Sequence, residues 1–556
     1  PSSVETIGFG AFENTKIEDI SFEDGINLLT LGYRAFYNAK NLTSISIPAS
    51  VVSIDYYAFA ECRNLETVTF AEDNLLTGIY EGAFLNCVSL KNITIPDSII
   101  EISDYAFYGC SSLTRLPFSA TATVKGIYDY AFAYTGIREL IIPETVTDIG
   151  EYAFRGSKVK TVVIPDTQKD VLVIGIGALQ DCNELEELDI PFSGASLSDG
   201  ETRIWFGYIF GAGAASANYT YMPQTLRKIS IKEVVEADWY SIFGLTTNNP
   251  NAGYNCLSNI EHFDLPKGLT NIGNYAFSSC RSLTSVTIPI GVTSIGGSVF
   301  YGCGSLTSIV IPKGVTSIES YAFSGCRSLT NVTIPESVTS IDYAAFFACS
   351  SLTSIAITEG VTSIESYAFF GCSSLTSVIL PESLLSIDYS AFNGCSSLIS
   401  IVIPESLTSI GSFAFNGCDS LTSIVIPESV TNIGGSAFSG CSSLTSIAIP
   451  KGVTSIGDSA FSGCSSLISI AIPEGLTNIE SFAFSGCNSL TNITIPESVT
   501  SIGYAAFYGC SSLTSITIPE GVTSIDGAFN GCSSLTSITI PESLTSIGVN
   551  SFPYST

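Results

Sequence analysis

The sequence predicts an α/β repeat solenoid, a fold in which short, similar coils stack side by side around one continuous core. Three observations lead to this prediction. A 23-residue pattern returns from Leu283 onward, with one deletion before Cys532. Apolar residues keep the same positions in each copy, and an Ala-Phe pair or a close variant of it marks about 21 units along the chain. No single unit buries enough apolar surface to offset the entropy lost on ordering, so the units must stack.

The first part of each unit predicts a short strand. In the unit LTSIVIPESVTNIGGSAFSGCSS, which starts at Leu421, residues Leu421, Ile424 and Ile426 fit the L-x-x-L-x-L signature of a leucine-rich repeat. Ile424 and Ile426 alternate as a half-buried strand requires. Pro427 ends the strand, because proline has no N–H to donate to a ladder. We expect these strands to be parallel and to form the concave face of a leucine-rich-repeat superhelix.

The rest of each unit is expected to return the chain to the core through turns. Val430 and Ile433 bring apolar side chains back inward after the strand. Ala437 and Phe438 predict a short helical turn, which Gly440 closes. The prediction is therefore a superhelix of about 21 coils, with short strands or turns and short helical turns outside the concave face.

The regularity of the repeat divides the chain into three parts. Residues 1–191 are expected to form irregular leucine-rich repeats, and residues 261–556 form regular 23-residue repeats. Residues 192–260 break the period as an aromatic-rich insertion, beneath which the strand-like LRKISI at Leu226 continues the solenoid. Both ends fall inside a repeat, and the chain opens at Pro1 without a methionine. We therefore expect a segment of a longer protein.

The repeat resembles that of the BspA-like leucine-rich-repeat family of bacterial and protozoan surface proteins. The recurring string IPESVTSIGxxAFxGCSSLTS carries the resemblance over nearly the whole chain, because proline, Ala-Phe, Gly-Cys and the aliphatic positions recur together. The resemblance implies a secreted or cell-surface protein that binds macromolecules of a host or a neighbouring cell. Its partners are then expected to be proteins or glycans.

The composition argues against several other classes of function. The formal net charge is −30 at pH 7, and a field of that sign repels nucleic acid and anionic lipid. No apolar stretch is long enough to cross a bilayer, so no membrane insertion is expected from these residues. The sequence indicates no cofactor, and we expect a monomer.

Residue types that often carry catalysis are interpreted here as structural. Most of the 17 cysteines occupy one recurring slot, which holds Ala39 or Ser157 in weaker units, so the slot needs a small side chain rather than a thiolate. Cysteines at one repeat position lie one per coil and point the same way, so they cannot surround a metal ion. The same geometry disfavours disulfides, and we expect free thiols. His262 has no catalytic partners in its sequence context. Carboxylates such as Glu405 and Glu428 recur after the strand proline and indicate a solvated acidic edge. We expect no enzyme.

Candidate ligand-binding residues gather in the first half of the chain. Outward strand positions from Leu283 to Ile540 carry no charge, whereas earlier ones vary in charge from coil to coil, as selective recognition requires. The insertion adds clustered Trp and Tyr side chains, which are typical of binding hot spots. The candidates are Arg115, Arg138, Lys160, Arg227, Trp205, Tyr208, Tyr219, Tyr221, Trp239 and Tyr240. A solvated strand face for the charges and a loop core for the aromatics are the open alternatives.

Three functions remain open from the sequence. The first is a protein-interaction or adhesion module that uses the concave face and the insertion. The second is a structural spacer or stalk, which the near-identical coils after Leu283 favour. The third is ice binding through threonine rows such as Thr514 and Thr517, which is disfavoured because Ile399 and Ile468 interrupt the rows.

Overall fold

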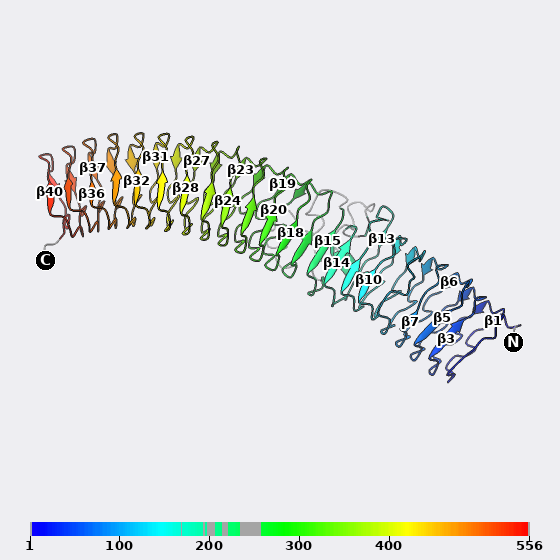
Figure 1. Cartoon of the computed structure of the whole chain (residues 1–556). Coiled ribbons are helices and arrows are strands. Elements are labelled where there is room, and N and C mark those ends of the chain that lie inside the picture. The colour runs from blue at the N-terminus through cyan, green and yellow to red at the C-terminus, as the bar shows by residue number, and fades with distance from the viewer. Residues whose placement is uncertain are drawn as a thin grey trace. The chain divides into compact units, whose positions relative to one another are not determined.

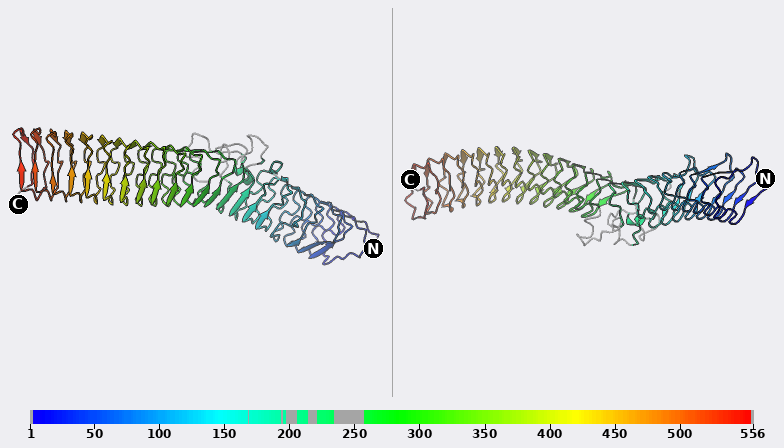
Figure 2. Two further views of the ribbon diagram at one scale, coloured as in Figure 1. Left: turned by 45° about the horizontal axis from the view of Figure 1, so that its top comes forward. Right: turned by 90° about the horizontal axis from the view of Figure 1, so that it is seen from below.

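The computed structural model describes residues 3–167, 169–192, 195–196, 206–213, 221–233 and 257–553. The chain divides into unit 1, Pro1–Leu269, and unit 2, Thr270–Thr556. Within each unit the described residues form coils that stack one after another (Figure 1; two further views in Figure 2). The described part of the chain makes about 22 turns with parallel strands, so the predicted solenoid is confirmed.

A first row of strands runs along each unit, with one strand in most coils, on the lower side in Figure 1. In unit 1 this row consists of β3 (Ser44–Ile47), β5 (Thr67–Phe70), β7 (Asn92–Ile93), β10 (Glu139–Ile141), β12 (Thr161–Val163), β14 (Glu187–Ile190), β15 (Lys228–Ile231) and β16 (His262–Asp264). In unit 2 it consists of β18 (Ser285–Thr287), β20 (Ser308–Val310), β22 (Asn331–Thr333), β24 (Ser354–Ala356), β26 (Ser377–Ile379), β28 (Ser400–Val402), β30 (Ser423–Val425), β32 (Ser446–Ala448), β34 (Ser469–Ala471), β36 (Asn492–Ile493), β38 (Ser515–Thr517) and β40 (Ser537–Thr539).

A second row of two-residue strands lies on the upper side in Figure 1. In unit 1 it consists of β1 (Thr6–Ile7), β2 (Thr30–Leu31), β4 (Ser53–Ile54), β6 (Gly78–Ile79), β8 (Glu101–Ile102), β9 (Gly126–Ile127), β11 (Asp148–Ile149) and β13 (Val173–Ile174). In unit 2 it consists of β17 (Asn271–Ile272), β19 (Ser294–Ile295), β21 (Ser317–Ile318), β23 (Ser340–Ile341), β25 (Ser363–Ile364), β27 (Ser386–Ile387), β29 (Ser409–Ile410), β31 (Asn432–Ile433), β33 (Ser455–Ile456), β35 (Asn478–Ile479), β37 (Ser501–Ile502), β39 (Ser524–Ile525) and β41 (Ser546–Ile547).

Strand pairing places equivalent residues of successive coils in columns. Between β28 and β30, for example, Ser400 pairs with Ser423 and Val402 with Val425, in parallel and without a shift. The central isoleucine of each such strand is buried, and the residues on either side are exposed. Alternation along the strand therefore turns one side-chain column into the core and two columns outward.

The Ala-Phe side of each coil is a turn, so the prediction of a short helical turn was wrong there. Among the described residues the only helix is the 3₁₀ helix η2 (Phe206–Phe210). Each turn instead places two residues in the left-handed region, such as Ser436 (φ 56°) and Gly440 (φ 75°). Phe438 N donates to Ala460 O of the next coil at 2.8 Å. Hydrogen bonds between coils thus replace the bonds that an α-helix would make within itself.

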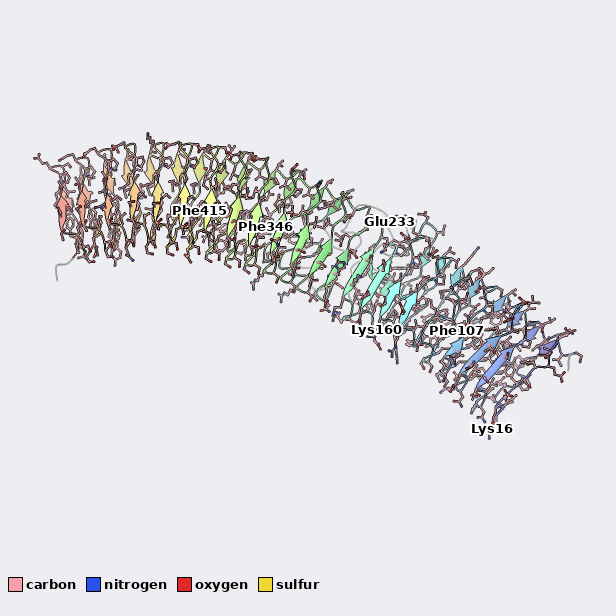
Figure 3. All side chains as sticks on the ribbon, in the orientation of Figure 1. Lys16, Phe107, Lys160, Glu233, Phe346 and Phe415 are labelled. Atoms are coloured by element: carbon pink, nitrogen blue, oxygen red, sulfur yellow. The ribbon has the colours of Figure 1, made fainter. Side chains whose placement is uncertain are left out.

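Phenylalanine rings from successive turns stack into a ladder inside each unit. Phe415 is fully buried, and its ring centroid lies 5.5 Å from that of Phe392 and 5.4 Å from that of Phe438, with nearly parallel planes. Figure 3 labels Phe107, Phe346 and Phe415 of this ladder. Because each ring covers the face of the next, the ladder buries apolar area that no coil could bury alone.

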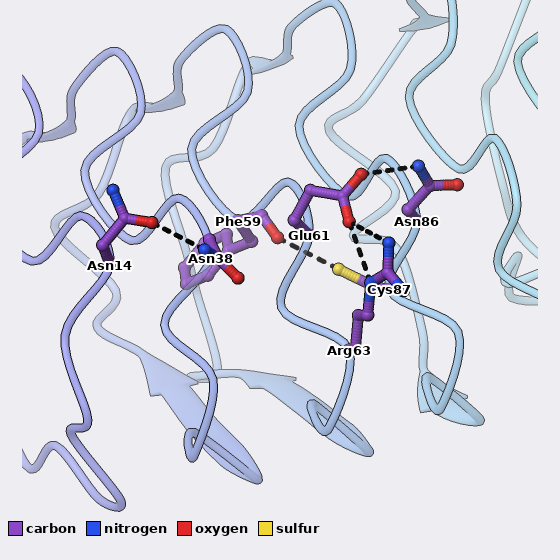
Figure 4. Close-up of polar contacts among 7 residues, drawn as sticks. All are labelled: Asn14, Asn38, Phe59, Glu61, Arg63, Asn86 and Cys87. Carbon is purple, nitrogen blue, oxygen red and sulfur yellow. Dashed lines mark hydrogen bonds and ion pairs between the residues drawn. The ribbon is translucent and has the colours of Figure 1, made fainter.

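The cysteine slot lies beside the ladder. The 16 described cysteines are free and buried. Cys87 Sγ donates to Phe59 O of the preceding coil at 3.1 Å (Figure 4), and Cys418 Sγ contacts Phe392 O in the same way at 3.4 Å. Ser157 fills the slot in one weaker coil, and its hydroxyl donates to Phe132 O at 2.9 Å. The slot therefore takes a small side chain, as the sequence predicted, and a polar one in it donates to the backbone.

Unit 1 links some of its turns through polar side chains at left-handed positions. Asn38 Nδ2 donates to Asn14 Oδ1 at 2.6 Å, and Asn86 Nδ2 donates to Glu61 Oε1 at 2.7 Å (Figure 4). Gly440 takes the corresponding position in unit 2. Asparagine is one of the residues that tolerate the left-handed region, so the position can also carry a side chain that bonds to the next coil.

The solenoid continues across the insertion, as the LRKISI segment predicted. Glu187 of β14 pairs directly with Lys228 of β15 in parallel register. Leu179 N donates to Ile209 O at 2.8 Å, so η2 takes the place of the next turn on the Ala-Phe side. The division of the chain at residues 191 and 260 stays a prediction.

Candidate functional site

The outward side chains of the first row in unit 1, with those just before each strand and at the equivalent residues 114 and 115, form a surface that we call the charged strand face. Its charges pair between neighbouring coils, and three such pairs lie just before the strands. Lys91 Nζ lies 2.7 Å from Glu66 Oε2, Lys160 Nζ lies 2.8 Å from Glu186 Oε1, and Arg227 Nε lies 3.6 Å from Glu261 Oε1. The hydrogen bond to Glu186 also raises the pKa of Lys160. These surface pairs contribute little to stability, because both partners remain accessible to solvent.

Two arginines on this face have no such partner. Arg115 and Arg138 are exposed, and among the described residues neither guanidinium takes part in a hydrogen bond or an ion pair. Both line one groove of about 1110 Å³ on unit 1. Its wall is partly apolar and includes Leu116, Phe118, Ile141, Pro143 and Val163. The structure thus brings together two of the arginines that the sequence singled out, beside an apolar surface.

The groove exists because the first row is interrupted in one coil. Strand pairing joins β3, β5 and β7, and starts again at β10, while residues 115–118 form no strand and pair only through an isolated parallel bridge between Phe118 and Ile95. In this coil Pro117 stands where the strand should continue, two positions earlier than Pro143 in the following coil. Proline lacks the N–H that the ladder needs, so the strand cannot form. The early proline is the sequence signal for the groove, and the sequence-based prediction missed it.

The loop that follows Pro117 is held in place by hydroxyl groups. Ser119 and Thr121 donate to the Asp97 carboxylate, and Thr123 Oγ1 donates to Asp97 O at 2.5 Å. The hydrogen bonds from Ser119 and Thr121 lower the pKa of Asp97. Phe118 turns its ring edge-on to Phe132, with ring centroids 6.1 Å apart. One rim of the groove is therefore formed before any ligand arrives.

A second, smaller hollow lies further along the charged strand face. It has a volume of about 390 Å³ and is lined by Glu187, Arg227, Lys228, Glu261 and His262, among others. His262 Nε2 lies 3.0 Å from Asp264 Oδ1 on the same strand. The one histidine is thus a half-buried strand residue beside a carboxylate.

The aromatic candidates of the insertion fall into two groups. Trp205, Tyr219, Trp239 and Tyr240 lie outside the described residues. Tyr208 lies in η2, where its side chain is buried and its carbonyl accepts from Gly177 N at 2.9 Å. Tyr221 is 44% exposed. The described residues therefore do not bring Tyr208 and Tyr221 together with the arginines of the groove.

The outward face of the first row in unit 2 is uncharged, as the sequence predicted. Its columns carry Ser, Thr and Asn together with aliphatic residues such as Ile379, Val402 and Val425, which are largely exposed. On another edge of the same coils Glu405 and Glu428 are exposed carboxylates. The same backbone therefore carries a charged face in unit 1 and a neutral one in unit 2.

The thiols are poorly placed for chemistry. Burial raises the pKa of Cys62, Cys372 and Cys464 to about 12, so these thiols stay protonated near neutral pH. Within the described ranges no group of His, Cys, Asp and Glu side chains has the arrangement of a metal site. The helical segments of the described residues include none with the length and hydropathy to cross a membrane.

The stacked parallel coils and their L-x-x-L-x-L strands define a leucine-rich-repeat solenoid, a class of protein whose extended surfaces serve as binding scaffolds. A family model described as the BspA type leucine rich repeat region (6 copies) matches residues 1–114, 77–200, 246–375, 339–468 and 433–556. Because these matches cover most of the chain, the protein belongs to the BspA-type leucine-rich-repeat family.

Two solved structures illustrate the similarity. A leucine-rich repeat protein from Bacteroides ovatus is 34% identical over 52% of this chain and 84% of its own, with a TM-score of 0.45. A leucine rich cell surface protein from Faecalibacterium prausnitzii is 34% identical over 50% of this chain and 87% of its own, with a TM-score of 0.38. No curated protein matches the chain.

Proposed function

We propose that this chain is a protein-interaction or adhesion module of a secreted or cell-surface protein, and that the charged strand face of unit 1 is its recognition surface. The observation that carries the proposal is the contrast between the two faces. Unit 2 builds the same coils with residues such as Thr284 and Ser285 at positions where unit 1 has Arg227 and Lys228. The fold of unit 2 is built without these charges, so the charges of unit 1 are better explained by selection of a partner than by the fold.

Binding, rather than catalysis, is the proposed activity. The charged strand face extends over many coils and varies from one to the next, which suits an extended macromolecular partner. The 16 described thiols are buried, and burial raises the pKa of, for example, Cys372 and Cys464. The family resemblance supports the surface location and a host or neighbouring cell as the source of the partner.

The test uses a full-length face variant in which Arg138, Lys160 and Arg227 are replaced by threonine. Threonine is the residue that unit 2 carries in the same column, at Thr284 and Thr307, so the coils should keep their fold. The matched control replaces Lys125, Lys313 and Lys451, three exposed lysines away from this face, by threonine. Both variants remove the same charge.

The measurement is capture of surface-exposed and extracellular-matrix proteins and of glycans by the immobilised chain. We expect the face variant to lose captured partners that the control retains, because only the face variant removes recognition charges. Equal capture by both variants would place recognition elsewhere. Circular dichroism of each variant verifies that the coils are intact.

A spacer role for unit 2 is the second candidate, and it is supported by the neutral, repeated face of that unit. Deleting residues 398–443 removes two whole repeats and joins Ser397 to Leu444 in the same phase of the pattern. If unit 2 acts as a spacer, the shortened chain binds the same partners with unchanged affinity. Loss of affinity in proportion to the deleted coils would instead indicate that unit 2 binds through its repeated surface.

A further inference from the structure

The interrupted coil of unit 1 has the features of a peptide-binding groove. The cavity of about 1110 Å³ lies between the loop after Pro117 and the coil that carries β10. The strand pairing that begins at β10 does not extend to residues 115–118, and the backbone bond that remains there is Arg138 N to Thr114 O at 3.3 Å. The edge of β10 that faces the groove is therefore without a strand partner among the described residues, and such an edge accepts an extended chain.

The charges of the groove favour an acidic ligand. Four successive coils place Lys91, Arg115, Arg138 and Lys160 on the charged strand face. Lys91 and Lys160 form ion pairs with Glu66 and Glu186. The guanidinium groups of the two arginines between them have no such partner among the described residues. The positive charge of the groove is confined to these two guanidiniums, because Glu139 and Glu144 also line it. Guanidinium groups bind carboxylates with two parallel hydrogen bonds, so the complementary group is a carboxylate.

The uncharged part of the lining favours a peptide over a dense polyanion. Ile141 is 55% exposed at the groove, and Leu116, Phe118 and Val163 also line it. Glu139 and Glu144 lie in the same lining and repel a ligand whose charge is negative along its whole length. A segment that alternates carboxylates with aliphatic side chains fits both the arginines and the apolar lining of the groove. Alternate residues of an extended chain point to opposite sides, so the two kinds of side chain can reach different surfaces.

The rim of the groove is already ordered, which lowers the entropy lost on binding. Ser119, Thr121 and Thr123 all bond to Asp97, and Thr145 Oγ1 donates to Val124 O at 2.7 Å. Pro143 and Pro165 in the lining, and Pro117 next to it, further restrict the backbone. A pre-formed site of this kind binds a ligand without paying for its own ordering.

We propose that this groove binds an extended acidic segment of a partner protein, with Arg115 and Arg138 holding its carboxylates and Ile141 contacting an aliphatic side chain between them. The proposal rests on the recognition function proposed above and names the chemistry of the partner at one place on that face. It assigns to Arg115 and Arg138 a different role from that of Lys91 and Lys160, which pair within the protein.

The first experiment pans a library of random short peptides on the immobilised full-length chain. The comparison is the variant Arg115→Ser/Arg138→Thr, which carries the residues of unit 2 in the same two columns, and the charge-matched control is Lys313→Gln/Lys451→Gln. We expect the wild type and the control to enrich peptides in which Asp or Glu flanks Leu, Ile, Val or Phe, and the arginine variant not to enrich them. Equal enrichment by the arginine variant, or no enrichment of acidic peptides, overturns the proposal.

The second experiment measures the affinity of one selected, fluorescently labelled peptide by anisotropy. We expect about a tenfold or larger loss when its acids are changed to amides, and a similar loss with the arginine variant. Ile141→Thr should weaken binding without changing its dependence on salt. Heparin serves as the polyanion probe. If heparin binds through the two arginines and no acidic peptide does, the groove takes polyanions and the peptide proposal is wrong.

The outcome is separable from that of the proposed function. If the face variant Arg138→Thr/Lys160→Thr/Arg227→Thr loses captured partners while no acidic peptide binds the groove, the recognition surface stands and the peptide assignment fails. If neither experiment detects binding, both fail. Circular dichroism of Arg115→Ser/Arg138→Thr provides the folding control, and both substituted side chains are exposed.

Discussion

At the scale of single residues, burial determines the protonation and reactivity of the thiols in the cysteine slot. Cys372 is fully buried, its thiol donates to Phe346 O at 3.2 Å, and burial raises its pKa to about 12. Ser157 does the same structural task in another coil with a hydroxyl. A residue type that is reactive elsewhere is thus held here as a protonated, small side chain of the core.

The first prediction concerns thiol reactivity. We expect Cys372 and Cys464 to resist iodoacetamide at pH 8 in the native protein and to react once the chain is unfolded in urea, because only the thiolate reacts and burial suppresses it. Cys532 is equally buried and should resist in the same way. Peptide mass spectrometry of timed reactions measures the rate at each cysteine. Rapid native alkylation of Cys372 would contradict the buried slot.

A second prediction concerns the carboxyl group of Asp342, which lies between coils that carry Glu319 and Glu365. Burial and the charges of these two glutamates raise its pKa. A carboxyl with a raised pKa in the folded state binds protons more tightly there than in the unfolded chain. Its contribution to stability is therefore present below the ordinary pKa of an Asp side chain and is lost as the pH rises through the raised value.

Replacing this carboxylate should accordingly stabilise the protein at neutral pH. We expect Asp342→Asn to raise the free energy of unfolding at pH 7 by about 0.5 kcal/mol, a value reduced for solvent screening. The difference from wild type should shrink as the pH falls toward about 4. Urea unfolding at several pH values measures both effects. Asp419→Asn, at an exposed site, is the control and should change little.

At the scale of elements, the phenylalanine ladder is the feature that each coil contributes and that only stacking completes. In unit 1 the ring of Phe59 stacks between Phe36 and Phe84 with centroid distances of 5.0 and 5.3 Å. Leu179 takes the same slot in one coil and is also buried. The slot therefore requires a large apolar side chain, and the aromatic ring adds the stacking contact.

The third prediction tests this slot in the middle of unit 2. We expect Phe415→Ala to lower the free energy of unfolding by about 3–5 kcal/mol, since it opens a cavity between two rings. Phe415→Leu, which copies Leu179, should cost less, about 1–2 kcal/mol. Chemical unfolding followed by circular dichroism measures the difference. Val425→Ala on the exposed face is the control, and a cost there as large as that of Phe415→Ala would contradict the burial pattern.

At the scale of the whole molecule, electrostatic repulsion between carboxylates is the contribution to stability that depends most on salt concentration. The chain has 51 acidic and 21 basic side chains, and stacking places carboxylates such as Glu382, Glu405 and Glu428 on successive coils. Equivalent residues of neighbouring coils are about 4.8 Å apart, well inside the Debye length at physiological salt. The folded coil stack therefore carries a repulsion that the extended unfolded chain largely relieves.

The fourth prediction is that salt stabilises this protein. We expect the melting temperature to rise between about 0.01 and 0.15 M NaCl, because the Debye length falls from about 30 to 8 Å. The double variant Glu405→Gln/Glu428→Gln should melt higher at low salt and respond less to added salt. Differential scanning calorimetry gives both quantities. A melting temperature that falls with salt would mean that the ion pairs of unit 1 outweigh the repulsion.

The repeat made most of the fold predictable from the sequence. The strand at Ile424, its end at Pro427, the small slot of the cysteines and the continuation at Leu226 all follow from residue patterns that recur in phase. The turn at Ala437 and Phe438 was predicted as helical because its length and composition fit a helix. The left-handed backbone at Ser436 and Gly440, and the bonds that the turn makes to the next coil, depend on neighbours that one repeat does not contain.

The candidate site was predictable only in part. The sequence alone determined the solenoid, the neutral face of unit 2 and the variable charges of unit 1, because each of these depends on one repeat and its period. Only the tertiary structure decided that Lys91 and Lys160 pair with Glu66 and Glu186. It also decided that Arg115 and Arg138 lie without partners among the described residues, and that both line one groove. The physical reason is that ion pairs and cavities form between coils, whereas the repeat pattern describes one coil at a time. The effect of Pro117 is seen only in the folded chain, where its missing N–H interrupts the first row of strands.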